Sequence, residues 1–262
     1  MIPDWLRAAT ILEGEVGSRA FGTNPASSDN DRMGVCIEPL SEAMGLRRNF
    51  EQVVHRTAED REGYKEAPSR AGDTDLTVYS LRKFARLCLD GNPSVLTLLY
   101  VPTKNMDAHG SRLRKLAPSF ASKRAGARFL GYMTQQKMRL LGERGQKNVN
   151  RAELVAKHGF DTKYTSHIIR LGWQGVEYLE TGQLTLPMTG QPLQECLDIR
   201  AGLWDIQQCL TWAGELEVML KDALSMSPLP ELPDEEGINT FVLDTYESVW
   251  SATYQQKWRE RR

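Results

Sequence analysis

The chain has 262 residues, of which 40% are hydrophobic and 26% charged, and its net charge is −1. This composition excludes a disordered chain and is typical of a globular protein with a substantial core. The near-zero net charge gives no indication about nucleic-acid binding, so the local distribution of charge matters more.

The first hundred residues alternate between strand and helix patterns. Residues 10–16 are apolar enough for a strand that leads into Gly17-Ser18, and residues 31–37 alternate as a second strand does. Residues 41–71 are polar and mixed, so we expect a long loop or irregular insertion there, with room for a short strand at 52–56. Residues 75–79 alternate again, and Ser80 is placed to cap a helix over residues 81–89.

The rest of the chain has helical periodicity. Apolar residues recur at helical spacing over residues 113–116, 127–141, 164–181 and 193–224, and a last helix is expected at 240–258, after an acidic, proline-rich linker. The patterns predict an α+β fold. A small mixed-sheet α/β domain spans residues 1–105, a helical domain spans 106–226, and a linker with a C-terminal helix spans 227–262.

Cysteine usage and hydropathy narrow the class of protein further. The four cysteines have neither the spacing of a zinc site nor that of a disulfide framework, and three of them (Cys88, Cys196, Cys209) are expected to be buried. No stretch is long enough for a membrane span, and the first residues lack the basic and apolar regions of a signal peptide. We therefore expect a cytoplasmic protein without a membrane partner. The oligomeric state is not predicted.

A glycine-serine turn and a pair of aspartates carry the chemistry. Asp29 and Asp31 are two residues apart at the start of a strand, so both carboxylates face one point. Two such carboxylates repel one another unless a cation lies between them, and Mg²⁺ prefers oxygen ligands together with substrate phosphates. Gly17-Ser18 offers backbone N–H groups and a hydroxyl for phosphate oxygens. Each motif alone is usually turn chemistry, but their order predicts a nucleotide-triphosphate site.

The same residues resemble a known family. The sequence resembles the signature of DNA polymerase β-like nucleotidyltransferases. More narrowly, it resembles the RNA-ligase-associated (RlaP-like) members of bacteria and phages. The residues that carry this resemblance are Gly17-Ser18-Arg19-Ala20-Phe21-Gly22, followed by Ser28-Asp29-Asn30-Asp31-Arg32-Met33-Gly34-Val35. Further matches to this subgroup are Tyr79-Ser80-Leu81-Arg82-Lys83-Phe84, Gly91-Asn92-Pro93 and Lys163-x-x-x-His167-x-x-Arg170. The resemblance implies a polymerase β-like palm, a divalent metal (Mg²⁺ or Mn²⁺) and an NTP substrate.

The family fold implies a third carboxylate on a neighbouring strand. Asp75 fits best, because it begins the predicted strand at 75–79, and Asp73 is the competitor two residues earlier. Members of the subgroup tend to carry an acidic residue after Asn92-Pro93, where this chain has Thr97 in an apolar run. Asp29, Asp31 and Asp75 are accordingly predicted as the catalytic and metal-binding residues, and Asp75 as the group that helps to deprotonate the acceptor.

Two groups of basic residues are candidates for phosphate binding. Lys163, His167 and Arg170 lie on one face of a predicted helix, and with Gly17, Ser18 and Arg19 they are predicted to bind the nucleotide. The alternative is a solvated helix face with a half-buried histidine. The second group lies within residues 111–147, which contain one acid, Glu143, and ten basic residues: Arg112, Arg114, Lys115, Lys123, Arg124, Arg128, Lys137, Arg139, Arg144 and Lys147.

The basic segment 111–147 could contact RNA, serve solubility, or bind the acidic residues between Glu231 and Glu247 of the same chain. We predict a metal-dependent nucleotidyltransferase that moves a nucleoside monophosphate from an NTP to an acceptor hydroxyl, first of all at a tRNA or repair-type RNA end. The alternatives are nucleotidylation of a protein or a small molecule, and a nucleotide-binding module without catalysis.

Overall fold

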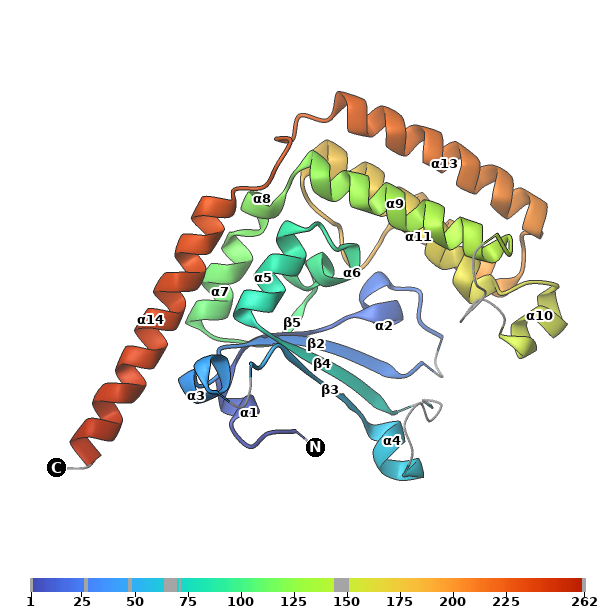
Figure 1. Cartoon of the computed structure of the whole chain (residues 1–262). Helices are drawn as coiled ribbons and strands as arrows, with labels where there is room; N and C mark the ends of the chain where they lie inside the picture. The colour runs from blue at the N-terminus through green and yellow to red at the C-terminus, as the bar shows by residue number, and fades with distance from the viewer. Residues whose placement is uncertain are drawn as a thin grey trace.

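The computed structural model describes residues 2–25, 28–46, 49–63, 70, 72–143 and 151–260, with side chains up to residue 253. In this part of the chain a five-stranded sheet of order β3-β4-β2-β1-β5 lies beneath a layer of helices (Figure 1). The pair β2–β4 is parallel and the other pairs are antiparallel. The fold is therefore α+β with a mixed sheet, as predicted.

Four of the five strands were predicted from alternating or apolar patterns. The strands are β1 (Thr10–Glu15), β2 (Asn30–Cys36), β3 (Gln52–Arg56), β4 (Thr74–Ser80) and β5 (Thr103–Met106). The edge strand β5 was not predicted, because it is short and only one of its four residues, Met106, is apolar. The predicted strand at 52–56 is confirmed, but helices flank it where a loop was expected.

Short helices surround the sheet. They are α1 (Leu6–Ala9), α2 (Gly17–Phe21), α3 (Leu40–Met44), α4 (Thr57–Glu62), α5 (Leu81–Leu89), α6 (Pro93–Leu96), the 3₁₀ turn η1 (Thr97–Leu99), α7 (Ala108–Lys115) and α8 (Ala117–Phe120). The predicted bounds and cap of α5 are confirmed, since the Ser80 hydroxyl accepts a hydrogen bond of 3.2 Å from the backbone N–H of Lys83. Thr97 is buried, and its hydroxyl donates to the Pro93 carbonyl at 2.9 Å.

Longer helices make up the rest of the described chain. They are α9 (Lys123–Leu140), α10 (Ala152–His158), α11 (Thr162–Thr181), α12 (Gly190–Ala201), α13 (Ile206–Met226) and α14 (Glu235–Glu260). The continuous helical pattern over 193–224 is in fact two helices, because Gly202 ends α12 with φ +77° and Asp205 caps α13. No helix of the described ranges has the length and apolar character that a membrane span requires.

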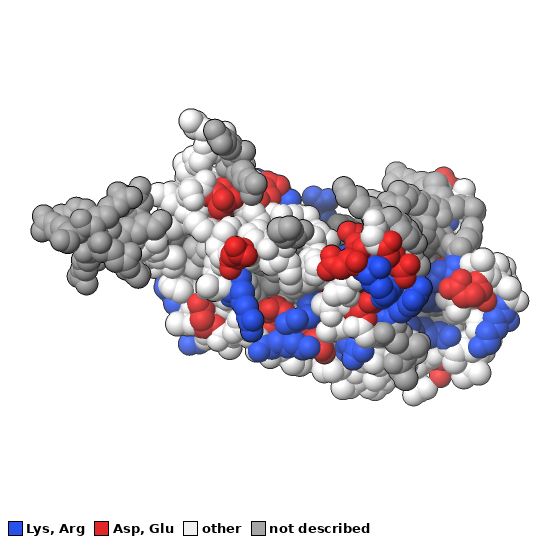
Figure 2. Space-filling view, turned by 90° about the horizontal axis from the view of Figure 1, so that it is seen from below, with Lys and Arg blue, Asp and Glu red and all other residues white. Residues whose placement is uncertain are grey.

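Charged residues of both signs are scattered over the face of the molecule opposite the upper helices. In the view from below, acidic and basic side chains are interspersed (Figure 2). Cross-strand ion pairs occur in the sheet: Arg32 pairs with Glu13, and Lys104 Nζ lies 2.7 Å from Glu15 Oε1. The view gives no indication of a uniformly basic surface on this face.

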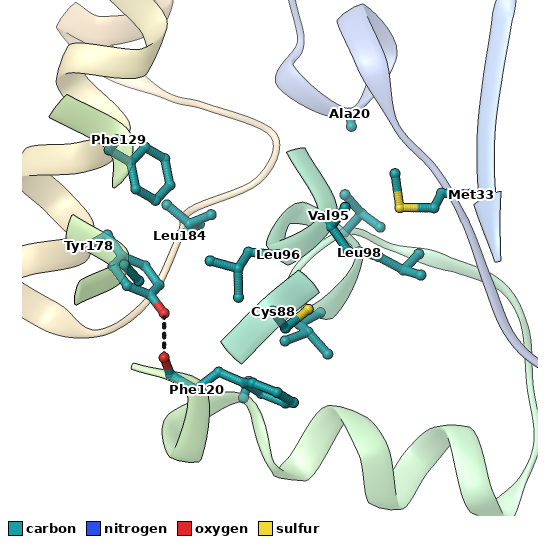
Figure 3. Close-up of a cluster of buried hydrophobic side chains, with 14 of the residues drawn as sticks. Ala20, Met33, Cys88, Val95, Leu96, Leu98, Phe120, Phe129, Tyr178 and Leu184 are labelled. Carbon is teal, nitrogen blue, oxygen red and sulfur yellow. Dashed lines mark hydrogen bonds between the residues drawn. The ribbon is translucent and has the colours of Figure 1, made fainter. Parts of the chain in front are cut away.

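One hydrophobic core joins the sheet to the long helices. Cys88 and Leu96 of the sheet-side helices lie in the same cluster as Phe129, Tyr178 and Leu184 (Figure 3). The buried hydroxyl of Tyr178 donates to the Phe120 carbonyl at 3.3 Å. The four cysteines are buried and unpaired, which confirms the expectation for Cys88, Cys196 and Cys209. Because this core is continuous, the division at residues 105 and 226 stays a prediction.

A buried carboxylate ties α11, α12 and α13 together. The indole N–H groups of Trp173 and Trp212 each donate to Glu195 Oε2 at 2.7 Å. The amide of Gln191 donates to Glu195 Oε1 at 2.9 Å. Glu195 on α12 is 8% exposed, so its loss would leave two partly buried donors without this acceptor.

Replacing Glu195 with Ala is expected to lower the free energy of unfolding by about 3 kcal/mol, because each orphaned indole N–H costs about 1–3 kcal/mol. Urea denaturation followed by tryptophan fluorescence measures this loss. The matched control is Gln194→Ala, an exposed position on the same helix, for which a change below about 0.5 kcal/mol is expected. Equal losses in the two variants would contradict the role of Glu195.

The C-terminal helix α14 is fastened to the sheet by a second buried carboxylate. Glu38, which follows β2, is 1% exposed and accepts the Tyr246 hydroxyl at 2.9 Å on Oε2. The indole N–H of Trp250 donates to the Glu38 carbonyl, also at 2.9 Å. Burial raises the pKa of Glu38. The segment after β2 and the last helix of the described chain are thus joined directly.

Candidate active site

Three carboxylates meet where β2 and β4 begin. Asp31 on β2 is the register partner of Asp75 on the parallel strand β4, and Asp29 lies two residues before Asp31. One oxygen from each of Asp29, Asp31 and Asp75 can be chosen so that all three lie within 4.8 Å of one another. The pairing of the two parallel strands therefore gathers the acids that the sequence placed 44 and 46 residues apart.

Asp73, the other candidate for the third carboxylate, makes its contacts outside the carboxylate cluster. Its carboxylate accepts hydrogen bonds from Arg61 Nη1 at 2.5 and 2.7 Å, from the backbone N–H of Arg70 at 2.7 Å and from the Thr57 hydroxyl at 3.2 Å. These contacts, that of Arg61 first, lower the pKa of Asp73 to about 2. Asp73 thus links α4 to the start of β4, while Asp75 lies in the carboxylate cluster.

The carboxylate cluster is electrostatically strained in the absence of a cation. Burial, followed by repulsion from Asp29 and Asp75, raises the pKa of Asp31 to about 6. The Mg²⁺ ligand distance is about 2.0–2.1 Å, so two oxygens on one ion lie up to about 4.2 Å apart. Small side-chain rotations would bring the oxygens of the cluster into that range. The three residues fit a hard divalent cation such as Mg²⁺ or Mn²⁺.

Asp75 also has a cationic neighbour on the edge strand. Arg56 on β3 is its register partner, and Arg56 Nε donates to Asp75 Oδ2 at 3.1 Å. Arg56 Nη1 lies 3.5 Å from Glu59 Oε1 as well. Arg56 therefore fixes the orientation of the third carboxylate from the side of β3.

The Gly17 turn is pressed against the carboxylate cluster. Gly17 has φ +66°, and a Cβ atom built on it would lie 2.1 Å from Asp31 Oδ2. The backbone N–H of Val16 donates to the Asp31 carbonyl at 2.9 Å, which holds the turn in place. Only glycine fits here, since both the backbone conformation and the space exclude a side chain.

Ser18 and Arg19 hold the loop before β2. The Ser18 and Ser28 hydroxyl oxygens are 3.2 Å apart. Arg19 Nε donates to the Asp29 carbonyl at 3.0 Å, and its Nη2 donates to the Ser28 carbonyl at 3.2 Å. Arg19 thus positions Asp29, and its proximity to phosphate stays a prediction.

A cavity of about 380 Å³ separates the carboxylates from α11. Its lining brings together six predicted site residues: Gly17, Ser18, Asp31, Lys163, His167 and Arg170. Arg151 and Arg200 also line it and were not identified from the sequence. Arg151 Nη1 pairs with the buried Asp161 at 2.7 Å. No local pattern connects Arg151 with Arg200 of α12, so only the tertiary fold reveals them.

The cationic wall of this cavity differs from the predicted one in its histidine. Arg170 is 6% exposed, its Nη2 lies 2.8 Å from His167 Nδ1, and its guanidinium lies 3.8 Å from the centre of the Phe21 ring. Burial and the charge of Arg170 lower the pKa of His167 to about 3, so His167 is neutral near pH 7. The positive charge comes from Lys163, Arg170, Arg151 and Arg200.

Arg170 is a buried cation without a carboxylate partner among the described residues. Besides His167 it contacts the amide oxygen of Gln174. Burial lowers the pKa of Arg170 to about 10, which still leaves it charged at neutral pH. A buried cation that faces a cavity favours the binding of an anion there.

The basic segment 111–147 is largely occupied within the chain. Lys123 Nζ lies 2.7 Å from Glu231 Oε1 and Lys137 Nζ lies 3.1 Å from Glu217 Oε2. Arg114 donates to the Leu99 carbonyl, and Arg128 donates to the Asp90 carbonyl. The guanidinium of Arg112 lies over the Phe241 ring. The ion pair between Lys123 and Glu231 agrees with the alternative that the basic segment binds acidic residues of the same chain. Arg144 and Lys147 lie outside the described residues.

A larger cavity, of about 1110 Å³, lies elsewhere, between α1, α3 and α14. It is lined mainly by apolar side chains such as Trp5, Met44 and Trp250. In the described residues the Asp29, Asp31 and Asp75 cluster is the one group of acids, histidines and cysteines with metal-binding geometry, and it does not line this cavity. The candidate active site is therefore marked by the carboxylate cluster and not by the larger of these two cavities.

A mixed sheet with three carboxylates beside a glycine-serine turn defines a polymerase β-like nucleotidyltransferase fold. The chain belongs to the RlaP family, the RNA repair pathway DNA polymerase beta family, whose sequence pattern matches residues 6–243. The family predicted from the motifs is thereby confirmed. A solved nucleotidyltransferase-like protein from Exiguobacterium sibiricum 255-15 is 12% identical, with a TM-score of 0.30 over 83% of this chain and 69% of that chain. No curated protein matches.

Proposed function

We propose that the chain transfers a nucleoside monophosphate from an NTP to a hydroxyl group at an RNA end. The observation that carries this proposal is that Asp31, one acid of the carboxylate cluster, lines the same cavity as Lys163 and Arg170. Such a cavity offers a cation on one wall and positive charge for a phosphate chain on the other. The RNA acceptor is supported by the RNA repair description of the family.

The donor phosphates fit between the Gly17 turn and α11. The cation held by the carboxylates would neutralise charge on the reacting phosphates and orient the attacking oxygen. Ser18 and the backbone of the Gly17 turn would bind phosphate oxygens from one side. Lys163 and Arg170 would bind them from the other side, with the neutral His167 keeping the Arg170 guanidinium in place.

The reaction is a substitution at the α-phosphorus. The acceptor oxygen forms a bond to this phosphorus, the bond from the same phosphorus to the α,β-bridging oxygen breaks, and pyrophosphate leaves. The hydroxyl proton passes to the carboxylate of Asp75. This role for Asp75 is supported by its position on β4, which lies on the other side of β2 from β1 and the Gly17 turn.

Incubation with each α-labelled NTP, Mg²⁺ and total RNA is expected to give labelled RNA. Label on protein or on a small molecule instead would replace the RNA acceptor by the corresponding alternative. Nucleotide binding that needs no metal and leads to no transfer would contradict the enzyme and favour a binding module. The control is the same incubation with EDTA in place of Mg²⁺, which is expected to give no label.

A further inference from the structure

The carboxylate cluster can be reached from two sides, and the donor nucleotide occupies one of them. The Gly17 turn follows β1, and the cavity and α11 lie on that side of the carboxylates. The sheet order β3-β4-β2-β1-β5 leaves β3 on the opposite side, beside Asp75 (Figure 1). An attacking oxygen must enter roughly opposite the leaving pyrophosphate. If the proposed function holds, the acceptor therefore reaches the carboxylates from the side of β3.

An open strip of the sheet lies on this approach. On β3 the residues Arg56, Val54 and Gln52 are the register partners of Asp75, Thr77 and Tyr79, so they share the face that carries the carboxylates. We call these three residues the β3 strip. Val54 is 55% exposed although it lies in the middle of the strand. The strip spans about 13 Å from Arg56 to Gln52 at about 3.3 Å per residue.

Beyond Gln52 the strip opens into a shallow hollow of about 590 Å³. The hollow is lined by Phe50, Lys83 and Asn49, and also by the acids Glu51 and Glu42. The Phe50 ring packs edge-on against Trp5, with the ring centres 5.1 Å apart, and it is only partly exposed beside Lys83. A partly exposed aromatic ring next to a lysine can contact a nucleobase together with its phosphate.

The start of α5 adds positive charge to this hollow. Arg82 Nη2 donates to Asn49 Oδ1 at 2.6 Å, Lys83 Nζ to Glu51 Oε2 at 2.7 Å and Arg86 Nη2 to Glu51 Oε1 at 3.0 Å. Arg82 and Lys83 belong to the motif at residues 79–84, for which the donor site has no use. Three cations thus converge on residues 49–51; Lys83 is the one among them that lines the hollow, and Glu51 balances one of the three charges.

We propose that the β3 strip and the hollow beyond it bind the single-stranded 3′ end of a polynucleotide acceptor. Arg56 lies at the phosphodiester next to the attacking hydroxyl, Val54 lies under the sugar, and the hollow takes an upstream base and phosphate. A guanidinium has five N–H donors, so Arg56 can contact an acceptor phosphate while it stays paired with Asp75 and Glu59. An elongated strip with cations at both ends suits a phosphate chain better than it suits a compact acceptor.

The test places charge at Val54, where exposure makes a substitution harmless to the fold. Binding of a short 5′-fluorescein single-stranded RNA to the full chain is followed by anisotropy. Val54→Glu is expected to weaken binding about tenfold and Val54→Arg to tighten it about threefold, because phosphate contacts dominate affinity. The matched control is Val218→Glu on α13, where the original side chain is 57% exposed. This control is expected to bind like the unaltered chain.

A second variant tests the hollow. Lys83→Gln is expected to weaken binding of the short RNA several-fold but to leave binding of a dinucleotide unchanged, because a dinucleotide is too short to reach Lys83. Single-stranded DNA of the same sequence and an RNA duplex distinguish the possible acceptors. Weaker binding of the duplex is expected, since a paired end does not lie flat on the strip.

The outcomes separate the strip from the proposed function. Unchanged RNA binding in both Val54 variants, or no binding of any single strand by the unaltered chain, would overturn the strip. Metal-dependent NTP binding, measured in the same variants, is expected to stay at its normal level. If that binding is absent in the unaltered chain, the proposed function fails. If it is present while Val54 has no influence on RNA, the inference fails alone.

Discussion

Replacing Asp31 with Asn is expected to lower nucleotidyl transfer by at least about a thousandfold. Asp31 is the central acid of the cluster, and a cation at the reacting phosphates contributes several kcal/mol to transition-state stabilisation. The measurement is the rate of label transfer from NTP at saturating Mg²⁺. The matched control is Asp73→Asn, because Asp73 is two residues from Asp75 but outside the cluster. Activity within tenfold of normal in Asp31→Asn would refute the site.

The same variant has a signature that does not depend on activity. The pKa of Asp31 is raised to about 6 from its ordinary value of 3.8, so the folded chain holds this proton more tightly than the unfolded chain does. The stability that this protonation contributes is fully present below about pH 4 and is lost as the pH rises through about 6. Metal-free Asp31→Asn should therefore melt at a higher temperature than the unaltered chain at pH 7.5, but not at pH 4.

A divalent metal is expected to reverse the order of the two melting temperatures at pH 7.5. Mg²⁺ or Mn²⁺ is expected to raise the melting temperature of the unaltered chain at pH 7.5, since an ion that binds only the folded state stabilises it. Asp31→Asn is expected to lose most of this rise. A melting temperature that responds equally to the metal in both proteins would place the cation elsewhere.

Gly17→Ala is expected to reduce transfer about a hundredfold or more. A methyl group at this position would lie 2.1 Å from Asp31 Oδ2, so either the turn or the carboxylate must move, and misplacement by about 1 Å costs about that factor. Gly190→Ala is the matched control. Gly190 has φ +63° against +66° for Gly17, but no atom lies within 4 Å of the position of its Cβ.

Both glycine variants should lose about 1–2 kcal/mol of stability from the left-handed backbone conformation. Only Gly17→Ala should lose activity, so the comparison separates backbone strain from displacement of Asp31. Measured melting temperatures and transfer rates for the pair check this. Equal activity losses would mean that the close approach to Asp31 has no catalytic importance.

The sequence predicted best those elements whose signal is local. Strand β4 has strict alternation, and α5 has a serine cap at its start and a glycine-asparagine-proline stop at its end. The strand β5 and the break at Gly202 escaped prediction for opposite reasons. The strand has too few apolar residues to show a pattern, while the apolar spacing of α12 continues in phase across the break into α13.

The site was predictable where it depends on motifs and unpredictable where it depends on burial. Asp29 and Asp31 are near neighbours in the chain, and family resemblance indicated Asp75. The neutrality of His167 follows from burial beside Arg170, which no spacing reveals. The contribution of Arg200 depends on how α12 packs against α11, and sequence alone contains no trace of that contact.

The fastening of α14 has a consequence for how the protein is made. Glu38 and Tyr246 are 208 residues apart, yet the phenol is the donor that satisfies the buried acid. During synthesis the strands β1 and β2 leave the ribosome long before their partner helix exists. Contacts across so long a stretch of chain close slowly. Glu38 therefore stays exposed to water, without its phenol donor, until the residues of α14 have been translated.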